Sequence, residues 1–497
     1  MENPFENEAM EANHMKQLLL AVLLPLFTVT CSMAQNYHGI QGSSHAGALG
    51  VHNNPAAIVN TPFKWDLVLF GAQLKSSTNA FTIYDYSLLS SPANSLLYID
   101  KGQYSRKANL NFNVNLLNTR IALNRKSSIA FGAAIRGYSN LKTSAYNFID
   151  TLNNVSNFLQ INPGLSNLNG KALSSSWLEG YLSYARTLSD NEAGRLNAGL
   201  TIRVGRGISG GYARINNLSY TTTQVNNRTI YSATAADFDY GYSSNYDRIQ
   251  RSNSSSQNTN NFIAYTEGGA SLDAGIEYLV KPQGTSSFND DNDYYDYDWK
   301  LGISLLDIGG QRYKYGTESR VIYGVKTNVT GTTLDNKFDS TIGTVKQFND
   351  SLATLITGNQ LGGKFTVLNP MRLVINIDHY LTGNFYINGE LSFNIPLSSI
   401  NKLYQQVKEI NLLTVTPRWE RKRWGVYLPL QYNTQNQFWV GGAFKAGPLL
   451  LGIHNWANIF SKSSVQNGGG YIALILRAPK GSEGKSDKRL DCPPAIW

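Results

Sequence analysis

Residues 108–116 alternate strictly between apolar and amide side chains. Leu110, Phe112, Val114 and Leu116 occupy one parity, and asparagine occupies every position between them. Because successive side chains of a β-strand point to opposite faces, this segment predicts a strand with one apolar and one polar face. Such a strand suits either a soluble β-sandwich or a barrel in the outer membrane.

The same alternation recurs towards the end of the chain. After residue 34, no stretch approaches the roughly 20 consecutive apolar residues that a membrane-spanning helix requires. We therefore predict an all-β fold, a transmembrane antiparallel β-barrel of about 14 strands that encloses a polar lumen. The expected strands lie at 65–75, 108–123, 128–141, 175–188, 195–207, 262–280, 298–308, 370–380, 384–396, 409–420, 423–433, 436–446, 448–456 and 468–477.

The composition favours this class. Charged residues make up 15% of the chain, compared with about 25% in soluble domains. The 29 tyrosines, 20 phenylalanines and 8 tryptophans are suited to the aromatic girdles of a barrel at the membrane interfaces. A secreted array of soluble β-sandwiches is the alternative fold, but the chain lacks linker-like composition at intervals of about 100 residues.

The connections between the expected strands also alternate. Short turns and long loops follow one another, as in barrels whose short turns face the periplasm. The short connections lie at 124–127, 189–194 and 381–384. The long ones lie at 142–174, 208–261 and 309–369, and the medium linker 281–297 is an exception. The polar run Ser252–Asn261 is predicted to be a mobile loop.

The N-terminal region predicts secretion. Met15-Lys16-Gln17, the apolar run 18–29 and the cleavage segment Ser32-Met33-Ala34, with small residues at its two ends, form a signal peptide that leaves Gln35 as the first mature residue. A lipoprotein signal ending at Cys31 is the alternative. Cleavage after Ala34 would leave only Cys492, so no intramolecular disulfide is expected. The expected organisation is a leader over 1–34, a plug-like segment over 35–64, a barrel over 65–477 and a periplasmic tail over 478–497.

Extending the face parity along the strands places charged side chains of both signs inside the barrel. A mixed interior favours ion pairs, either among these residues or with a plug, because unpaired buried charges are costly. The simpler alternative is that these charges only keep the lumen hydrated. The predicted lumen-facing residues are Arg136, Glu179, Arg195, Arg203, Glu267, Asp273, Glu277, Arg372, Asp378 and Glu390.

Two sets of residues resemble metal ligands. His38, His45 and His52 recur every seven residues, but the glycines between them disfavour the helix that would align them. An acidic run has the oxygen ligands that calcium prefers, yet it lacks the glycine and the closing glutamate of an EF-hand. Its members are Asp290, Asp291, Asp293, Asp296 and Asp298. We expect no metal and no other cofactor.

The formal charge of +9 does not indicate a nucleic-acid partner, because the basic residues are scattered rather than gathered on one helix. The one short cluster is assigned to a turn near lipid headgroups, and it consists of Arg418, Arg421, Lys422 and Arg423. Catalysis is not expected either. The His–polar pairs at 378–379 and 454–455 have no serine motif, and neighbouring residues of a strand face opposite ways.

Two short motifs resemble known barrels. Asn54-Pro55-Ala56 follows a run of small residues just before the first strand, and Leu306-Asp307-Ile308-Gly309-Gly310 ends a middle strand. In these motifs and in layout, the chain resembles a family of uncharacterised outer-membrane barrels from Bacteroidota. It also resembles FadL-type fatty-acid transporters and PorV-type barrels of the type IX secretion system. The resemblance implies that Asn54, Pro55 and Ala56 belong to a plug or ligand segment.

Three functions are compatible with these observations. The first is a non-enzymatic accessory or binding barrel in protein export or surface assembly, with a secretion or surface-assembly protein as its partner. The second is a FadL-like channel for hydrophobic small molecules. The third, less favoured, is an enzyme at the barrel rim. All three place the protein in the outer membrane, in contact with lipid.

Overall fold

The computed structural model describes residues 37, 39–85, 96–149, 155–162, 168–225, 228–250, 252–282, 297–325, 330–338, 342, 344–397, 405–457 and 464–479. The predicted signal peptide, both cysteines and residues 480–497 of the predicted tail lie outside these residues, and so do His38 and most of the acidic run at 290–298. No helix in the described part of the chain is long and apolar enough to cross a membrane.

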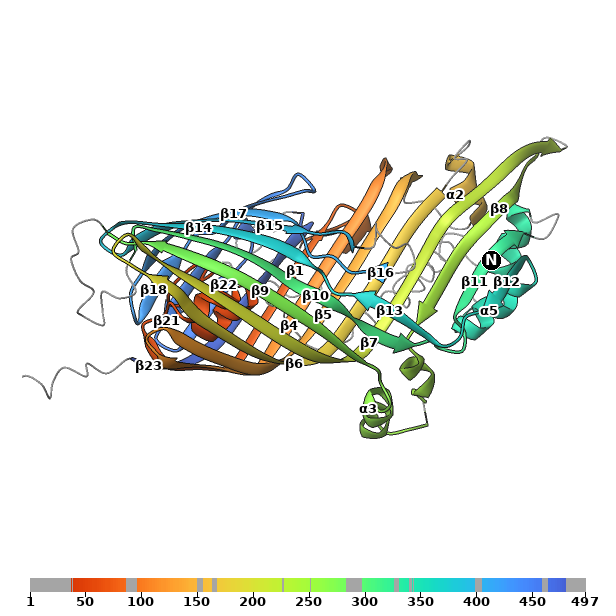
Figure 1. Ribbon diagram of the computed structural model, residues 1–497. Coiled ribbons are helices and arrows are strands. Elements are labelled where there is room, and N and C mark those ends of the chain that lie inside the picture. Colours follow the sequence, from red (N-terminus) through yellow and green to blue (C-terminus); the bar gives the residue numbers. More distant parts are fainter. Residues whose placement is uncertain are drawn as a thin grey trace, which may run out of the picture.

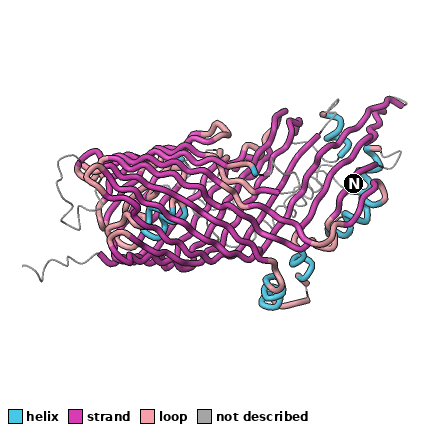
Figure 2. The backbone as a smooth tube through the Cα atoms, in the orientation of Figure 1, coloured by secondary structure: helices cyan, strands magenta, loops and turns pink. Residues whose placement is uncertain are grey.

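The described strands form a closed antiparallel barrel of 14 wall strands, which confirms the predicted fold class (Figures 1 and 2). β23 pairs with β1 from Phe63↔Pro479 to Ser77↔Asn467, and this pairing closes the ring. In ring order the wall consists of β1 (Phe63–Thr78), β4 (Gly102–Asn124), β5 (Ser127–Phe148), β6 (Leu168–Asp190), β7 (Gly194–Val225), β9 (Gly268–Val280), β10 (Trp299–Lys314), β14 (Arg372–Thr382), β15 (Phe385–Asn394), β17 (Leu412–Glu420), β18 (Trp424–Tyr427) with β19 (Leu430–Asn433), β20 (Phe438–Val440) with β21 (Gly442–Ala446), β22 (Leu449–Ile453) and β23 (Asn467–Pro479).

The outside of this wall is apolar. Large aliphatic side chains such as Leu182 and Val204 are 59% and 63% exposed, which is the arrangement expected where lipid replaces water. Tyrosine and tryptophan are exposed near the strand ends on the side of the barrel where the short turns lie, as in an aromatic girdle. These residues include Trp65, Tyr278, Trp299, Tyr380 and Trp424.

The two ends of the barrel differ. Short turns join β4 to β5, β6 to β7 and β14 to β15 at one end, which we call the short-turn end. At the other end, the long-loop end, several strands continue beyond the barrel and form a wing, seen at the right of Figure 1. The wing consists of the distal part of β7, β8 (Arg228–Tyr242), β11 (Arg320–Val325), β12 (Ile356–Gln360), α4 (Gly331–Lys337) and α5 (Val345–Ala353). Smaller elements at this end are β2 (Phe81–Tyr84), β3 (Leu96–Ile99), α2 (Val155–Ile161), η5 (Ser244–Arg248), β13 (Lys364–Leu368) and β16 (Gln405–Gln406).

The wing corrects the prediction of long loops at 208–261 and 309–369. The polar run at 252–261 contributes most of α3 (Ser255–Ile263), which begins with a reciprocal capping box between Ser254 and Gln257. The wall strand expected at 262–280 therefore begins only at Gly268. The alternation of apolar and polar residues does not predict these elements, because the wing strands pack on one another and on α5 rather than on lipid.

Strict alternation also fails where a strand bulges. In β4 a register shift lies between Asn115 and Leu117, so that Leu116 and Leu117 are both exposed on the outer surface. Beyond this bulge Asn118 and Arg120 turn inward and are fully buried. A bulge therefore places Arg120 in the lumen.

Candidate functional site

Residues 39–62 fill the lumen near the short-turn end, and we call them the plug. Two short 3-10 helices shape the plug, η2 (Gly47–His52) and η3 (Pro55–Ile58). The glycines exclude a long helix, as predicted, but they permit these tight turns. Gly47 has a φ of 59°, and a Cβ atom there would lie 2.5 Å from the Asp66 carboxylate of β1. Only glycine therefore fits at this approach of plug and wall.

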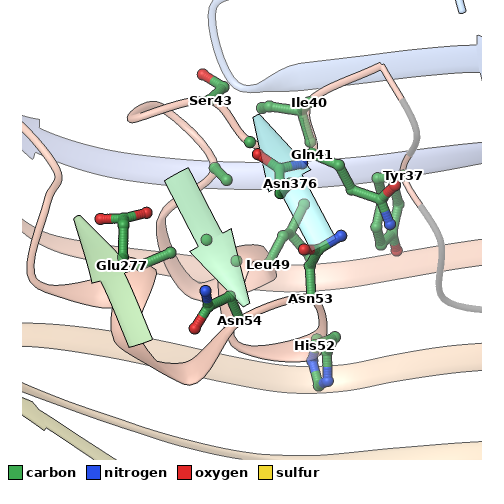
Figure 3. Close-up of a pocket in the computed structure, with 15 residues that line it drawn as sticks. Tyr37, Ile40, Gln41, Ser43, Leu49, His52, Asn53, Asn54, Glu277 and Asn376 are labelled. Atoms are coloured by element: carbon green, nitrogen blue, oxygen red, sulfur yellow. The ribbon is translucent and has the colours of Figure 1, made fainter. Parts of the chain in front are cut away.

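The motif Asn54-Pro55-Ala56 sits against the barrel wall. The Asn54 side chain accepts a hydrogen bond from the Ala56 amide at 2.9 Å and so caps η3, while its amide group donates to the carbonyl of Ile276 in β9 at 2.9 Å. Proline suits the first position of a helix because its missing N–H has no partner there. The motif thus connects the plug to the wall through a hydrogen bond, and Figure 3 shows Asn54 beside the strands.

Glycines in the wall make room for this motif. Gly199 of β7, Gly275 of β9 and Gly302 of β10 lie on adjacent strands, and a side chain on any of them would meet Asn54 or Pro55. A Cβ on Gly199 would lie 2.5 Å from the Pro55 carbonyl carbon. We call these three residues the glycine seat. Neighbouring strands without side chains here allow the plug to contact the backbone of the wall.

Side chains of the wall also hold the plug by hydrogen bonds. Glu390 accepts from Asn53 at 2.6 Å, and Glu420 accepts from Ser43 at 2.5 Å. Carbonyl groups of the plug accept from the wall, as when Arg120 donates to Ile58 at 2.8 Å. Charge-assisted bonds of this kind are stronger than neutral ones.

A first network of buried ion pairs lies next to His52 of the plug. Arg136 forms a bidentate pair with Asp307 at 2.5 and 2.7 Å, and Arg203 pairs with Glu179 at 2.6 Å and Asp273 at 2.7 Å. Burial and the Arg203 guanidinium hold the pKa of His52 well below its usual range. The neutral ring nitrogen Nδ1 is 3.3 Å from Arg203 and can accept its hydrogen bond.

Asp307 reaches Arg136 because β10 is irregular at this point. A register shift falls between Leu305 and Ile308, and Asp307 has a φ of 62°. Its amide donates to Asp273 at 2.7 Å, which stabilises the left-handed conformation. The motif at 306–310 is therefore a bulge that directs a carboxylate into the lumen, a role commonly seen for bulges at functional sites.

A second network lies on the opposite wall. Arg418 pairs with Asp378 at 2.6 Å and Glu420 at 3.3 Å, and Lys445 pairs with Glu420 at 2.8 Å. Arg418 was assigned to a surface turn from the sequence, and this assignment is wrong: the residue lies in β17 and is buried in the lumen. The turn begins only after Glu420.

The structure places the predicted lumen residues as follows. Arg136, Glu179, Arg195, Arg203, Asp273, Glu277, Arg372, Asp378 and Glu390 are all buried. Glu267 is not in the lumen but pairs with Lys364 at 2.9 Å at the long-loop end, because β9 starts after it. Sequence parity missed several charged groups that the two networks and the plug use, and these are Asp66, Lys75, Arg120, Asp307, Glu409, Glu420 and Lys445. Lys75 and Glu409 pair with each other at 2.8 Å.

The lumen holds little free space around the plug. A cavity of about 30 Å³ lies among plug residues and the wall residues Glu277, Gly302 and Asn376 (Figure 3). This volume accommodates about two water molecules. In the described part of the chain, side chains of the plug and the wall thus fill most of the lumen at this level.

An aromatic layer lies in the lumen between the ion-pair networks and the wing. Tyr138 and Trp177 are stacked with ring centroids 5.6 Å apart, and Tyr313 stacks on Phe365 at 5.4 Å. The layer is anchored to the first network, because the Trp177 indole donates to Glu179 at 2.7 Å. Its members are Tyr138, Leu173, Trp177, Tyr212, Tyr313, Phe365, Val367 and Val407.

The histidines that the structure describes do not gather into a site. His45 lies 3.8 Å from Glu420 and His52 lies beside Arg203. His379 stacks on Trp299 at 3.9 Å, while its neighbour Asp378 faces inward to Arg418. Among the described residues, no group of three His, Cys, Asp or Glu residues could hold a metal ion.

The chain belongs to a family of unknown function, DUF5723, whose model matches residues 55–453. Among solved structures, the Ralstonia pickettii toluene transporter TbuX is 11% identical, covering 91% of this chain and 100% of its own, with a TM-score of 0.39. A Pseudomonas aeruginosa FadL homologue is 11% identical, with coverages of 89% and 97% and a TM-score of 0.39. The P. putida toluene transporter TodX is 9% identical, with coverages of 86% and 92% and a TM-score of 0.38. A comparison with curated proteins finds no match.

Proposed function

We propose that this protein is a gated outer-membrane channel for small hydrophobic molecules, and that the plug closes it. The aromatic layer carries this proposal. The interior of a transmembrane barrel is ordinarily polar, yet eight apolar or aromatic side chains gather here on the lumen side. The side chains of this layer are at most 8% exposed, so it is closed in this structure, and their separation would offer apolar solutes a favourable place to leave water.

The way in which the plug is held also supports a gate. Hydrogen bonds to the wall hold it, some of them to charged side chains, and the glycine seat lets its backbone contact the wall. Contacts of this kind can be exchanged for contacts with water one at a time, so the plug can move without unfolding the wall. Passage of a solute requires such a movement, because the cavity beside the plug holds only about two waters.

Uptake of radiolabelled toluene by intact cells tests the proposal, since toluene is the molecule named for two of the compared barrels. A strain that expresses this protein should take up toluene faster than the same strain with an empty vector. Tyr313→Lys places a charge in the aromatic layer and should abolish the increase. Tyr323→Lys, at a residue exposed on β11, is the matched control and should keep it. Equal uptake with and without the protein would contradict the proposal.

A second candidate is an accessory barrel in protein export or surface assembly. The wing favours it, because β8, β11, β12 and α5 extend beyond the wall and take no part in closing the barrel. Native mass spectrometry of the protein extracted gently from its own outer membrane separates the two candidates. A stoichiometric protein partner supports the accessory function, and a bound apolar small molecule without a partner supports the channel.

A further inference from the structure

Four basic residues stand in direct register across four neighbouring wall strands. Lys107 of β4 is opposite Lys142 of β5, Lys142 is opposite Lys171 of β6, and Lys171 is opposite Arg214 of β7. Directly opposed residues of antiparallel strands project from the same face of the sheet. The four side chains therefore form one line, which we call the cationic row.

The cationic row faces the inside of the long-loop end. Tyr212, two residues before Arg214, and Leu173, two residues after Lys171, both belong to the buried aromatic layer. Because residues two apart on a strand share a face, the row lies directly above that layer on the inner surface. The exposed residue Lys408 lies nearby, since its backbone exchanges two hydrogen bonds with the Asn140 side chain, at 2.6 and 2.8 Å.

The row carries an excess of positive charge. Its neighbour on β8 is Asp239, which binds Arg214 through two hydrogen bonds of 2.7 and 3.0 Å. Among the described residues, no carboxylate forms an ion pair with Lys142 or Lys171. Like charges directly opposite one another destabilise a sheet. The directly opposed cations of the row therefore lower the stability of the barrel when no ligand is bound.

The row lies beyond the membrane-spanning part of the wall. On β6 the exposed apolar residues of the outer surface begin at Leu178, and Lys171 is seven residues further out, about 23 Å along an extended strand. Burial lowers the pKa of the Lys171 ammonium to about 8, with the charges of Arg214 and Lys408 adding to the effect. A bound anion would relieve that cost. Since the row faces inward, the headgroups of the surrounding lipid lie on the other side of the wall.

We propose that the cationic row binds an extended oligoanion, a soluble chain that carries several phosphate or carboxylate groups. The geometry decides between a single anion and a chain. Neighbouring strands are about 4.8 Å apart, so four cations in register extend over about 14 Å. One phosphate or carboxylate reaches only one or two of them, whereas repeated anionic groups can contact them all. The site is independent of the proposed channel, because it requires no movement of the plug.

Binding to the full-length barrel in lipid nanodiscs tests this inference. The probes are polyphosphate and oligogalacturonate of similar length, with dextran as the neutral chain, measured by isothermal titration calorimetry. At least one oligoanion should bind, dextran should not, and the affinity should fall steeply as salt rises. Binding of polyphosphate alone identifies a phosphate site, binding of oligogalacturonate alone a carboxylate site, and binding of both a site that selects charge.

Variants show whether the row is responsible. The double variant Lys142→Gln, Lys171→Gln should weaken binding about tenfold, because it removes two partly exposed ion contacts. Lys346→Gln removes a lysine of α5 that pairs only with Asp350 among the described residues, and it should bind as the original protein does. Heat-modifiable migration on a gel reports that each variant is folded. Failure of both oligoanions to bind, or an unchanged affinity in the folded double variant, would overturn the inference.

Discussion

The two halves of the lumen differ in whether their charged side chains form ion pairs. Near the short-turn end, most buried arginines face carboxylates at hydrogen-bond distance, as Arg136 and Arg418 do, and Arg120 donates to a carbonyl group of the plug instead. At the long-loop end, Lys142 and Lys171 stand opposite each other without an ion pair in the described part of the chain. Deep charges must find ionic or hydrogen-bonding partners within the protein because water is excluded. Charges at the long-loop end can be paired by a ligand from outside the protein. Whether a charged side chain has a partner within the protein therefore distinguishes residues that stabilise the fold from residues that bind a ligand.

The largest expected effect comes from breaking a deep pair. Arg418→Ala leaves the Asp378 carboxylate buried without its guanidinium, which should cost about 3 to 5 kcal/mol of folding free energy. Urea unfolding in lipid vesicles measures the loss. The matched control is Arg423→Ala, at an exposed residue of the adjacent turn, for which we expect a change within about 0.5 kcal/mol. Equal stability of the two variants would remove the distinction between deep and exposed charge.

A smaller effect is expected from filling the glycine seat. Gly275→Leu places a side chain where Asn54 lies, and such overpacking typically costs about 1 to 3 kcal/mol. Hydrogen exchange of amides in the plug should accelerate, because the plug loses its contact with the wall. Gly180→Leu is the control, since only the Gly132 carbonyl lies near that position, at 3.8 Å. Unchanged exchange in the Gly275 variant would show that the seat does not hold the plug.

At the long-loop end, removal of charged side chains should barely alter the free energy of unfolding. Lys142→Gln with Lys171→Gln removes two cations that oppose each other, so the free energy of unfolding should stay within about 0.5 kcal/mol or rise slightly. The measurement is the urea unfolding used for Arg418→Ala. A loss of several kcal/mol would mean that these lysines are structural, like the deep arginines.

The smallest effect concerns pH. Lysine is charged below its pKa, and the pKa of Lys171 is lowered to about 8. Affinity for an oligoanion should therefore be full near pH 7 and decline as the pH rises through about 8 to 9. In Lys171→Gln this decline should be smaller. Titration calorimetry at several pH values checks it, and an identical pH profile in both proteins would exclude Lys171 as the titrating group.

The sequence predicted the barrel well because lipid imposes a simple rule. Each of the predicted segments overlaps a wall strand, since every wall strand must place apolar residues outside and polar residues inside. It failed where that rule does not act. The wing strands contact one another rather than lipid, and the helix at 255–263 is specified by its cap rather than by periodicity.

The candidate site was accessible in part for the same reason. Parity identified Arg136, Arg203 and Arg372 as inward-facing, but a bulge in β4 hid Arg120 and another in β10 hid Asp307. The cationic row could not be seen either, because its register joins residues 29 to 43 positions apart in the chain. Pairing between strands, rather than the order of residues, creates it.

Conductance across a planar lipid bilayer tests the central claim, a wall closed by a plug that can be displaced, most directly. The purified barrel should insert without opening a steady pore, because plug and ion pairs fill the short-turn half. Gly275→Leu should produce open-channel steps under the same conditions, while Gly180→Leu should remain closed. A steady open pore in the original protein would contradict the account. So would a Gly275→Leu variant that shows no channel openings although hydrogen exchange of its plug amides is accelerated.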